Sequence, residues 1–231
     1  MSRGTLILLC ALAGVIALGW VAWRRATALR RDDGAAAVTI DKQAENFAQR
    51  TFDAANPPAD MPAMNPGEEA VTDSNFVSGV NVSGRTHPGD GTHETVTITQ
   101  IHVTLQLELT IWVPSDVTQH VLGHEQGHRE ISEYYYRDAD KVARRIATGY
   151  IGREEVVSGA DLAAASGEWL QQMGKEISDE YNRELNPDPA QQRYDLITNY
   201  SRNGVVAADA VKQVLNDLAG ATSAPAGSSN N

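Results

Sequence analysis

The chain has 231 residues, a formal net charge of −11 and 21% charged residues. This length suits one domain with a hydrophobic core together with appended segments. The acidic balance, with no cluster of Lys and Arg in the body of the chain, argues against nucleic acid as a partner, because phosphates require clustered basic side chains.

The N-terminal residues 1–32 predict a membrane anchor or a signal sequence. The stretch TLILLCALAGVIALGWVAW holds nineteen residues without a charge, enough to cross a hydrocarbon core as a helix. Trp20 and Trp23 lie where an interfacial aromatic belt is expected, which favours an uncleaved, single-pass anchor. The four arginines at 24–31 outnumber Arg3, and this asymmetry alone would place the C-terminal side in the cytoplasm.

Residues 33–70 predict a linker that merges into the edge of the domain, because the prolines of NPPADMPAMNP exclude a regular helix. The folded domain is expected over 71–219. The polar and Gly-containing residues 220–231 predict a disordered tail.

Residues 76–113 predict strands on either side of the turn-rich sequence PGDG. Apolar and polar residues alternate over 101–113, which is typical of a strand with one buried face. The aliphatic residues over 101–113 occupy odd-numbered positions, whereas Val96 and Ile98 occupy even-numbered ones. We therefore expect a bulge or a turn near 99–100.

A helix is predicted to follow Pro114, with Ser115 or Asp116 capping its first amides and Gly149 supplying the stop. A second helix is expected over 158–185, where SGAD resembles a capping box. Two shorter helices are expected at 190–200 and 207–219.

The predicted fold class is therefore α+β: an N-terminal transmembrane helix, then a small antiparallel sheet packed against a bundle of helices.

Two histidines of the sequence HVLGHEQGHREI point to a metal site. His124 and His128 are four residues apart on the apolar face of the predicted helix, so two imidazoles within about 6 Å can share one tetrahedral zinc ion. Glu125 is rotated by about a hundred degrees, where it can act as a base beside the ion. His120 lies too far along the helix axis from His128 to join them. The only cysteine, Cys10, lies in the apolar N-terminal run.

The segment HEQGHREISEYYYRDADKVARRI resembles the HEQGH helix of a bacterial family of uncharacterised, predicted secreted zinc-dependent proteases, defined as a domain of unknown function. A family segment of the type Tyr-Asp-x-x-Thr-x-His-Gly also resembles YDLITNYS, which begins at Tyr194. These two segments carry the resemblance. It implies a zincin-like fold, zinc, peptide hydrolysis and an extracytoplasmic domain.

The third zinc ligand is open at this point. Where the family has the His of its His-Gly pair, this chain has Tyr200, which would have to bind zinc as a phenolate. The alternatives are an aspartate of the same segment and three glutamates of the preceding helix: Asp195, Glu168, Glu176 and Glu180.

The sequence thus predicts a zinc metallopeptidase with His124, His128 and Tyr200 as ligands and Glu125 as general base. We expect a protein or peptide substrate and a domain on the periplasmic side of the inner membrane, with the cytoplasmic face as the alternative. The strand that ends before the helix is expected to pair with an extended substrate. The alternative function is a catalytically inactive, membrane-tethered module for binding or envelope assembly. Oligomeric state is not predicted.

Overall fold

The computed structural model describes residues 37–223, so the membrane segment predicted over 1–32 lies outside the described residues. Within them, no helix is both long enough and apolar enough to span a membrane. The elements in chain order are β1 (Val38–Lys42), β2 (Asn46–Phe52), β3 (Val71–Pro88), β4 (His93–Pro114), α2 (Gln119–Arg137), α3 (Ala139–Thr148), β5 (Glu154–Ser158), α4 (Leu162–Glu184), α5 (Asp188–Thr198) and α6 (Ala207–Ser223).

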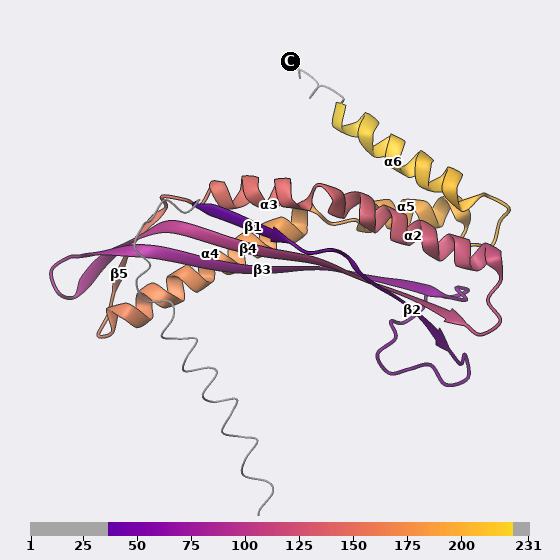
Figure 1. The fold of residues 1–231 in the computed structure, drawn as a ribbon, viewed down its shortest axis with the longest axis horizontal. Coiled ribbons are helices and arrows are strands. Elements are labelled where there is room, and N and C mark those ends of the chain that lie inside the picture. The colour runs from indigo at the N-terminus through magenta and orange to yellow at the C-terminus, as the bar shows by residue number, and fades with distance from the viewer. Residues whose placement is uncertain (1–36, 224–231) are drawn as a thin grey trace, which may run out of the picture. The chain divides into compact units, whose positions relative to one another are not determined.

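Strand β4 organises the sheet, because all four other strands pair with it (Figure 1). β3 runs antiparallel to β4 along one edge. β5, β1 and β2 follow one another along the other edge, opposite residues 93–97, 101–105 and 108–114. β1 and β2 are parallel to β4, so the sheet is mixed and the prediction of an antiparallel sheet was wrong in this respect.

Both edges of β4 are therefore occupied. The sequence predicts that this strand pairs with an extended substrate, but its backbone groups already bond to neighbouring strands. Part of the range 33–70, predicted to be linker and domain edge, supplies two of those neighbours, β1 and β2.

The bulge predicted near 99–100 is confirmed. Ser83 pairs with Gln100, and the next residue, Gly84, pairs with Ile98, so Thr99 is the extra residue of β4. An extra residue moves the following side chains to the opposite face of a strand. As a result, residues on both sides of the bulge bury their apolar side chains on the same face of the sheet.

Helices α2, α3 and α4 cover that face and leave the other one more exposed. Figure 1 shows α2 and α3 end to end along the hairpin of β3 and β4. The shared core contains Ile98, Ile101, Val103, Leu105, Leu107 and Leu109 from β4 and Ala143, Ile146, Met173, Ile177 and Tyr181 from the helices. Each large side chain buried in this way contributes about 1.5–3 kcal/mol to folding.

The single helix predicted from Pro114 to Gly149 is divided in two. α2 begins after Thr118, whose hydroxyl accepts a hydrogen bond from the amide of Val121 (3.2 Å), so neither Ser115 nor Asp116 is the cap. A turn at Asp138 separates α2 from α3, and Gly149 ends α3 as predicted.

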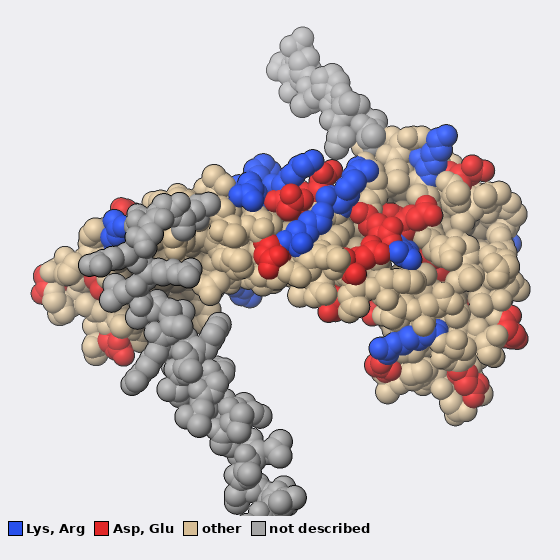
Figure 2. Space-filling view, viewed as in Figure 1, with Lys and Arg blue, Asp and Glu red and all other residues tan. Residues whose placement is uncertain are grey.

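Acidic and basic side chains are interspersed along α2 and α3 on the face that Figure 2 shows. Many of them are paired: Arg129 contacts Glu45 and Glu133, and Lys141 contacts Asp138. Exposed pairs of this kind contribute about 0–1 kcal/mol each. They give this surface a mixed charge and add little to the stability of the fold.

Candidate metal centre

Helix α2 directs the predicted histidines into the protein. His124 and Glu125 are 4% and 3% exposed, and the side chain of His128 is 14% exposed. Polar groups buried to this extent cost free energy unless they find partners. Their partners come from α5 on one side of α2 and from β3 on the other.

Three donor atoms converge between α2 and α5. Nε2 of His124 lies 3.2 Å from Nε2 of His128, and Oδ1 of Asp195 lies 3.3 Å from the first nitrogen and 2.9 Å from the second. Around a tetrahedral zinc ion with bonds of about 2.0–2.2 Å, donor atoms lie about 3.3–3.6 Å apart. The three residues therefore form a group that could hold a metal ion.

Hydrogen bonds satisfy only part of this arrangement. The two Nε2 atoms are close enough to share one proton, but among the described residues Oδ1 of Asp195 has no aligned hydrogen bond and Nδ1 of His124 has no partner. A lone pair that is buried without a proton donor is costly. A cation placed between the three donors would satisfy Oδ1, so the residues present fit a bound metal.

The charges at this place also favour a cation. Burial by itself raises the pKa of Asp195, but the contacts with His124 and His128 outweigh burial and lower that pKa to about 2. Burial lowers the pKa of His128, and here Asp195 and Glu125 outweigh it, so the net pKa is raised. The site thus keeps its aspartate ionised and favours positive charge beside it.

Glu125 lies on the sheet side of the imidazole pair and outside the group of three. The hydroxyl of Thr72 in β3 donates to Oε2 of Glu125 (2.7 Å). The same hydroxyl lies 3.1 Å from the backbone carbonyl oxygen of Glu125. Burial raises the pKa of Glu125, and His128 and Thr72 partly offset the rise. A carboxylate held in this way is suited to accept a proton.

One turn of α5 completes the site. Gln191, Tyr194 and Asp195 are spaced i, i+3 and i+4, so their side chains share one face of the helix. Tyr194 stacks on the ring of His124 with centroids 5.0 Å apart and donates a hydrogen bond to the carbonyl of His124 (3.0 Å). The small core of α2, α5 and α6 holds this turn in place, through Ile131, Ala190, Tyr194, Ala210, Val211 and Val214.

The glycine between the histidines makes room for Tyr194. A Cβ atom at Gly127 would lie 2.1 Å from the hydroxyl oxygen and 2.5 Å from Cζ of that tyrosine. No side chain fits at this distance. Gly127 therefore allows α5 to approach α2 closely enough for Asp195 to reach the histidines.

The structure gives the third donor to Asp195, one of the alternatives, and not to Tyr200, the first choice. Tyr200 follows the end of α5 in a left-handed turn, and its ring lies against the guanidinium of Arg202 (5.3 Å). The helix glutamates lie on α4, where Glu180 accepts a hydrogen bond from Tyr150 and Glu176 one from Gln172. Glu168 is exposed on the same helix. None of the four belongs to the group of three.

Replacing Asp195 by Ala should lower the affinity for Zn²⁺ by at least about a hundredfold, since a site with two protein ligands binds zinc weakly. Tyr200→Phe is the matched control, because it removes only a hydroxyl, and its affinity should stay within about twofold of the unmodified chain. Competition with a coloured chelator measures both constants. Loss of zinc in Tyr200→Phe with retention in Asp195→Ala would reverse the assignment.

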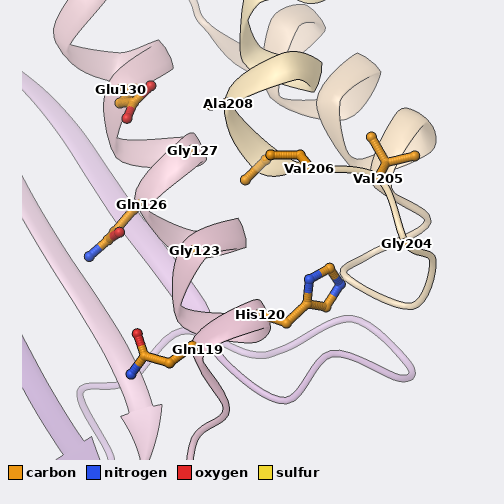
Figure 3. Close-up of a pocket in the computed structure, with 11 residues that line it drawn as sticks. Gln119, His120, Gly123, Gln126, Gly127, Glu130, Gly204, Val205, Val206 and Ala208 are labelled. Carbon is orange, nitrogen blue, oxygen red and sulfur yellow. The ribbon is translucent and has the colours of Figure 1, made fainter.

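A separate cavity of about 390 Å³ lies on another side of α2, against residues 204–208 (Figure 3). Gly123 and Gly127 form part of its lining, and His120 lies beside the loop at Gly204. Neither His124 nor His128 lines it. His120, the third histidine of the sequence HVLGHEQGHREI, therefore belongs to the surface of this cavity and not to the metal group.

Three residues around the candidate metal group were not predicted from the sequence: Thr72, Gln191 and Tyr194, the last as a contact of His124. The spacing of Gln191, Tyr194 and Asp195 was a usable signal, because three residues able to bond or stack with imidazoles share one face of a predicted helix. Nothing in the sequence marked Thr72, because its role depends on the packing of β3 beside α2.

Comparison of the chain with protein-family models, with curated proteins and with solved structures gives no match in any of the three.

Proposed function

We propose that the protein is a zinc-dependent peptidase in which His124, His128 and Asp195 bind the ion and Glu125 is the general base. The observation that carries the proposal is the convergence of the three donor atoms within 3.3 Å of one another, with a buried carboxylate alongside. Two imidazoles and a carboxylate suit Zn²⁺ and leave a fourth position open for water or substrate.

Zinc at this place would lower the pKa of a water molecule towards about 7 and polarise a peptide carbonyl. Glu125 would take a proton from that water and deliver it to the leaving amine. The hydrogen bond from Thr72 restrains the carboxylate, and the burial of Glu125 makes it a stronger base than an exposed glutamate.

Strand β3 offers an edge to an extended substrate, in place of β4. Among the described residues, β3 pairs with no strand other than β4, so no strand occupies its second edge. Thr72 of the same strand contacts the base. A peptide that added to this edge by main-chain hydrogen bonds would lie close to Glu125.

Removal and return of the metal tests the proposal. The full-length chain loaded with zinc should hydrolyse a dye-labelled unfolded protein, lose this activity on treatment with a chelator, and regain it with about one equivalent of Zn²⁺. The ion is needed both to activate water and to polarise the carbonyl. A chain that binds zinc and hydrolyses no peptide in a broad library would contradict the peptidase and support the non-enzymatic alternative.

A further inference from the structure

Gln191 of α5 contacts His128 on the side of the ring that faces away from the metal group. Its Oε1 lies 2.6 Å from Nδ1 of His128. Its Nε2 donates to the carbonyl of His128 (3.0 Å) and to the hydroxyl of Ser132 (3.0 Å). Ser132 is fully buried and donates in turn to the carbonyl of His128 (3.1 Å).

These contacts leave one consistent placement of the protons. Both amide hydrogens of Gln191 are used, because His128 O and Ser132 Oγ each accept one. If the amide were turned over, its oxygen would face the carbonyl oxygen of His128, and two acceptors would meet. Oε1 must therefore face Nδ1, and a proton on Nδ1 is needed to form that hydrogen bond. In the neutral ring, Nε2 then carries the lone pair, on the side that faces His124 and Asp195.

We propose that Gln191 is a positioning residue for His128, which holds the imidazole in the tautomer protonated at Nδ1 and directs Nε2 to the metal ion. The inference rests on the proposed metal site and names the group that orients one of its ligands. A metal-bound histidine commonly donates its other N–H to a fixed acceptor, and loss of such an acceptor costs about 10–100-fold in metal affinity.

The second histidine is oriented in a different way. Nδ1 of His124 has no hydrogen-bond partner, and its ring is held by stacking on Tyr194 at 15° between the planes. Stacking restrains the orientation of the ring plane, but it does not determine which ring nitrogen carries the proton. Of the two imidazoles, His128 is thus the one whose protonation pattern the protein dictates, and Gln191 is the only residue that contacts its Nδ1 by a hydrogen bond among the described contacts.

The test uses the full-length chain with ¹⁵N-labelled histidine and Zn²⁺ alone as the probe. In the zinc-loaded protein, NMR should show a hydrogen-bonded, slowly exchanging proton on Nδ1 of His128. Gln191→Leu should lose this protected proton and bind Zn²⁺ about 10–100-fold more weakly. Gln192→Leu, at the exposed neighbouring position of α5, should match the unmodified chain in both measurements.

Gln191→Glu keeps an acceptor for Nδ1, but its second oxygen replaces the donor to the carbonyl of His128, so its Zn²⁺ affinity should lie between those of Gln191→Leu and the unmodified chain. It should retain the protected Nδ1 proton and bind Zn²⁺ more tightly than Gln191→Leu, which a role in packing alone would not produce. It also keeps the inference testable if the leucine variant does not fold. Coordination of zinc through Nδ1 of His128, or equal affinities in Gln191→Leu and the unmodified chain, would overturn it. A chain with the expected ring pattern but without peptidase activity would refute the proposed function and still support the role of Gln191.

Discussion

Glu125→Gln should retain about one zinc ion per chain and lose peptide hydrolysis by roughly 10²–10⁴-fold, the usual contribution of a positioned general base. Glutamine keeps the shape of the side chain and can still accept the hydrogen bond from Thr72, but it cannot take a proton from water at neutral pH. Metal analysis and initial rates on the same preparations separate the two effects.

Glu130→Gln is the matched control for this experiment. Glu130 is an exposed carboxylate of the same helix, so the change removes the same charge away from the metal group, and the rate should stay within about twofold. Hydrolysis that persists in Glu125→Gln would rule out the base, and loss of zinc from that variant would show that Glu125 holds the ion instead.

Gly127→Ala should lower the free energy of unfolding by about 1–3 kcal/mol, the usual cost of forcing extra volume into a packed interior. The new methyl group would meet Tyr194, which is fully buried and hydrogen-bonded to His124. Because Asp195 follows Tyr194 directly, displacement of this ring also moves the third ligand. Zinc affinity should fall together with stability, as urea unfolding and chelator competition would measure.

Gly123→Ala provides the comparison on the same helix. No heavy atom lies within 4 Å of a Cβ built at Gly123, so alanine fits there and should raise stability by up to about 1 kcal/mol through its better helix propensity. Two identical substitutions four residues apart should therefore change the free energy of unfolding in opposite directions. Equal stability of the two variants would show that Tyr194 yields to the methyl group without cost.

The features that could be predicted from the sequence are those fixed by local patterns. Alternating apolar residues marked β4, and their change of phase marked the bulge at Thr99. Helical spacing marked α2, and its inward face marked His124 and His128. These features follow from side-chain periodicity and turn chemistry, which neighbouring residues determine.

The features that could not be predicted depend on contacts between distant segments. β1 and β5 have five residues each and β2 has seven, and each is ordered by pairing with an edge of β4. Short strands with many polar residues carry little signal of their own, because pairing and packing decide strand formation. Their direction relative to β4 is a property of the whole sheet.

The third donor of the candidate metal group is another feature that depends on contacts between distant segments. Asp195 was one of five candidates, and the sequence favoured Tyr200 because of its place in the family segment. What selects Asp195 is the close approach of α5 to α2, which depends on the bare backbone at Gly127 and on the small core around Tyr194. This approach is a packing result, and neither helix displays it alone.

Because β4 is the common partner of the other strands in the described residues, we expect a particular order of folding. The hairpin of β3 and β4 is a local structure and can close early, whereas β1 and β2 have to search for a partner far along the chain, which is a slower, entropically costly step. As the ribosome delivers the N-terminal end first, these two strands emerge well before the strand they need. Their shortness and many exposed polar side chains suit that interval, since a longer apolar strand left unpaired would invite aggregation.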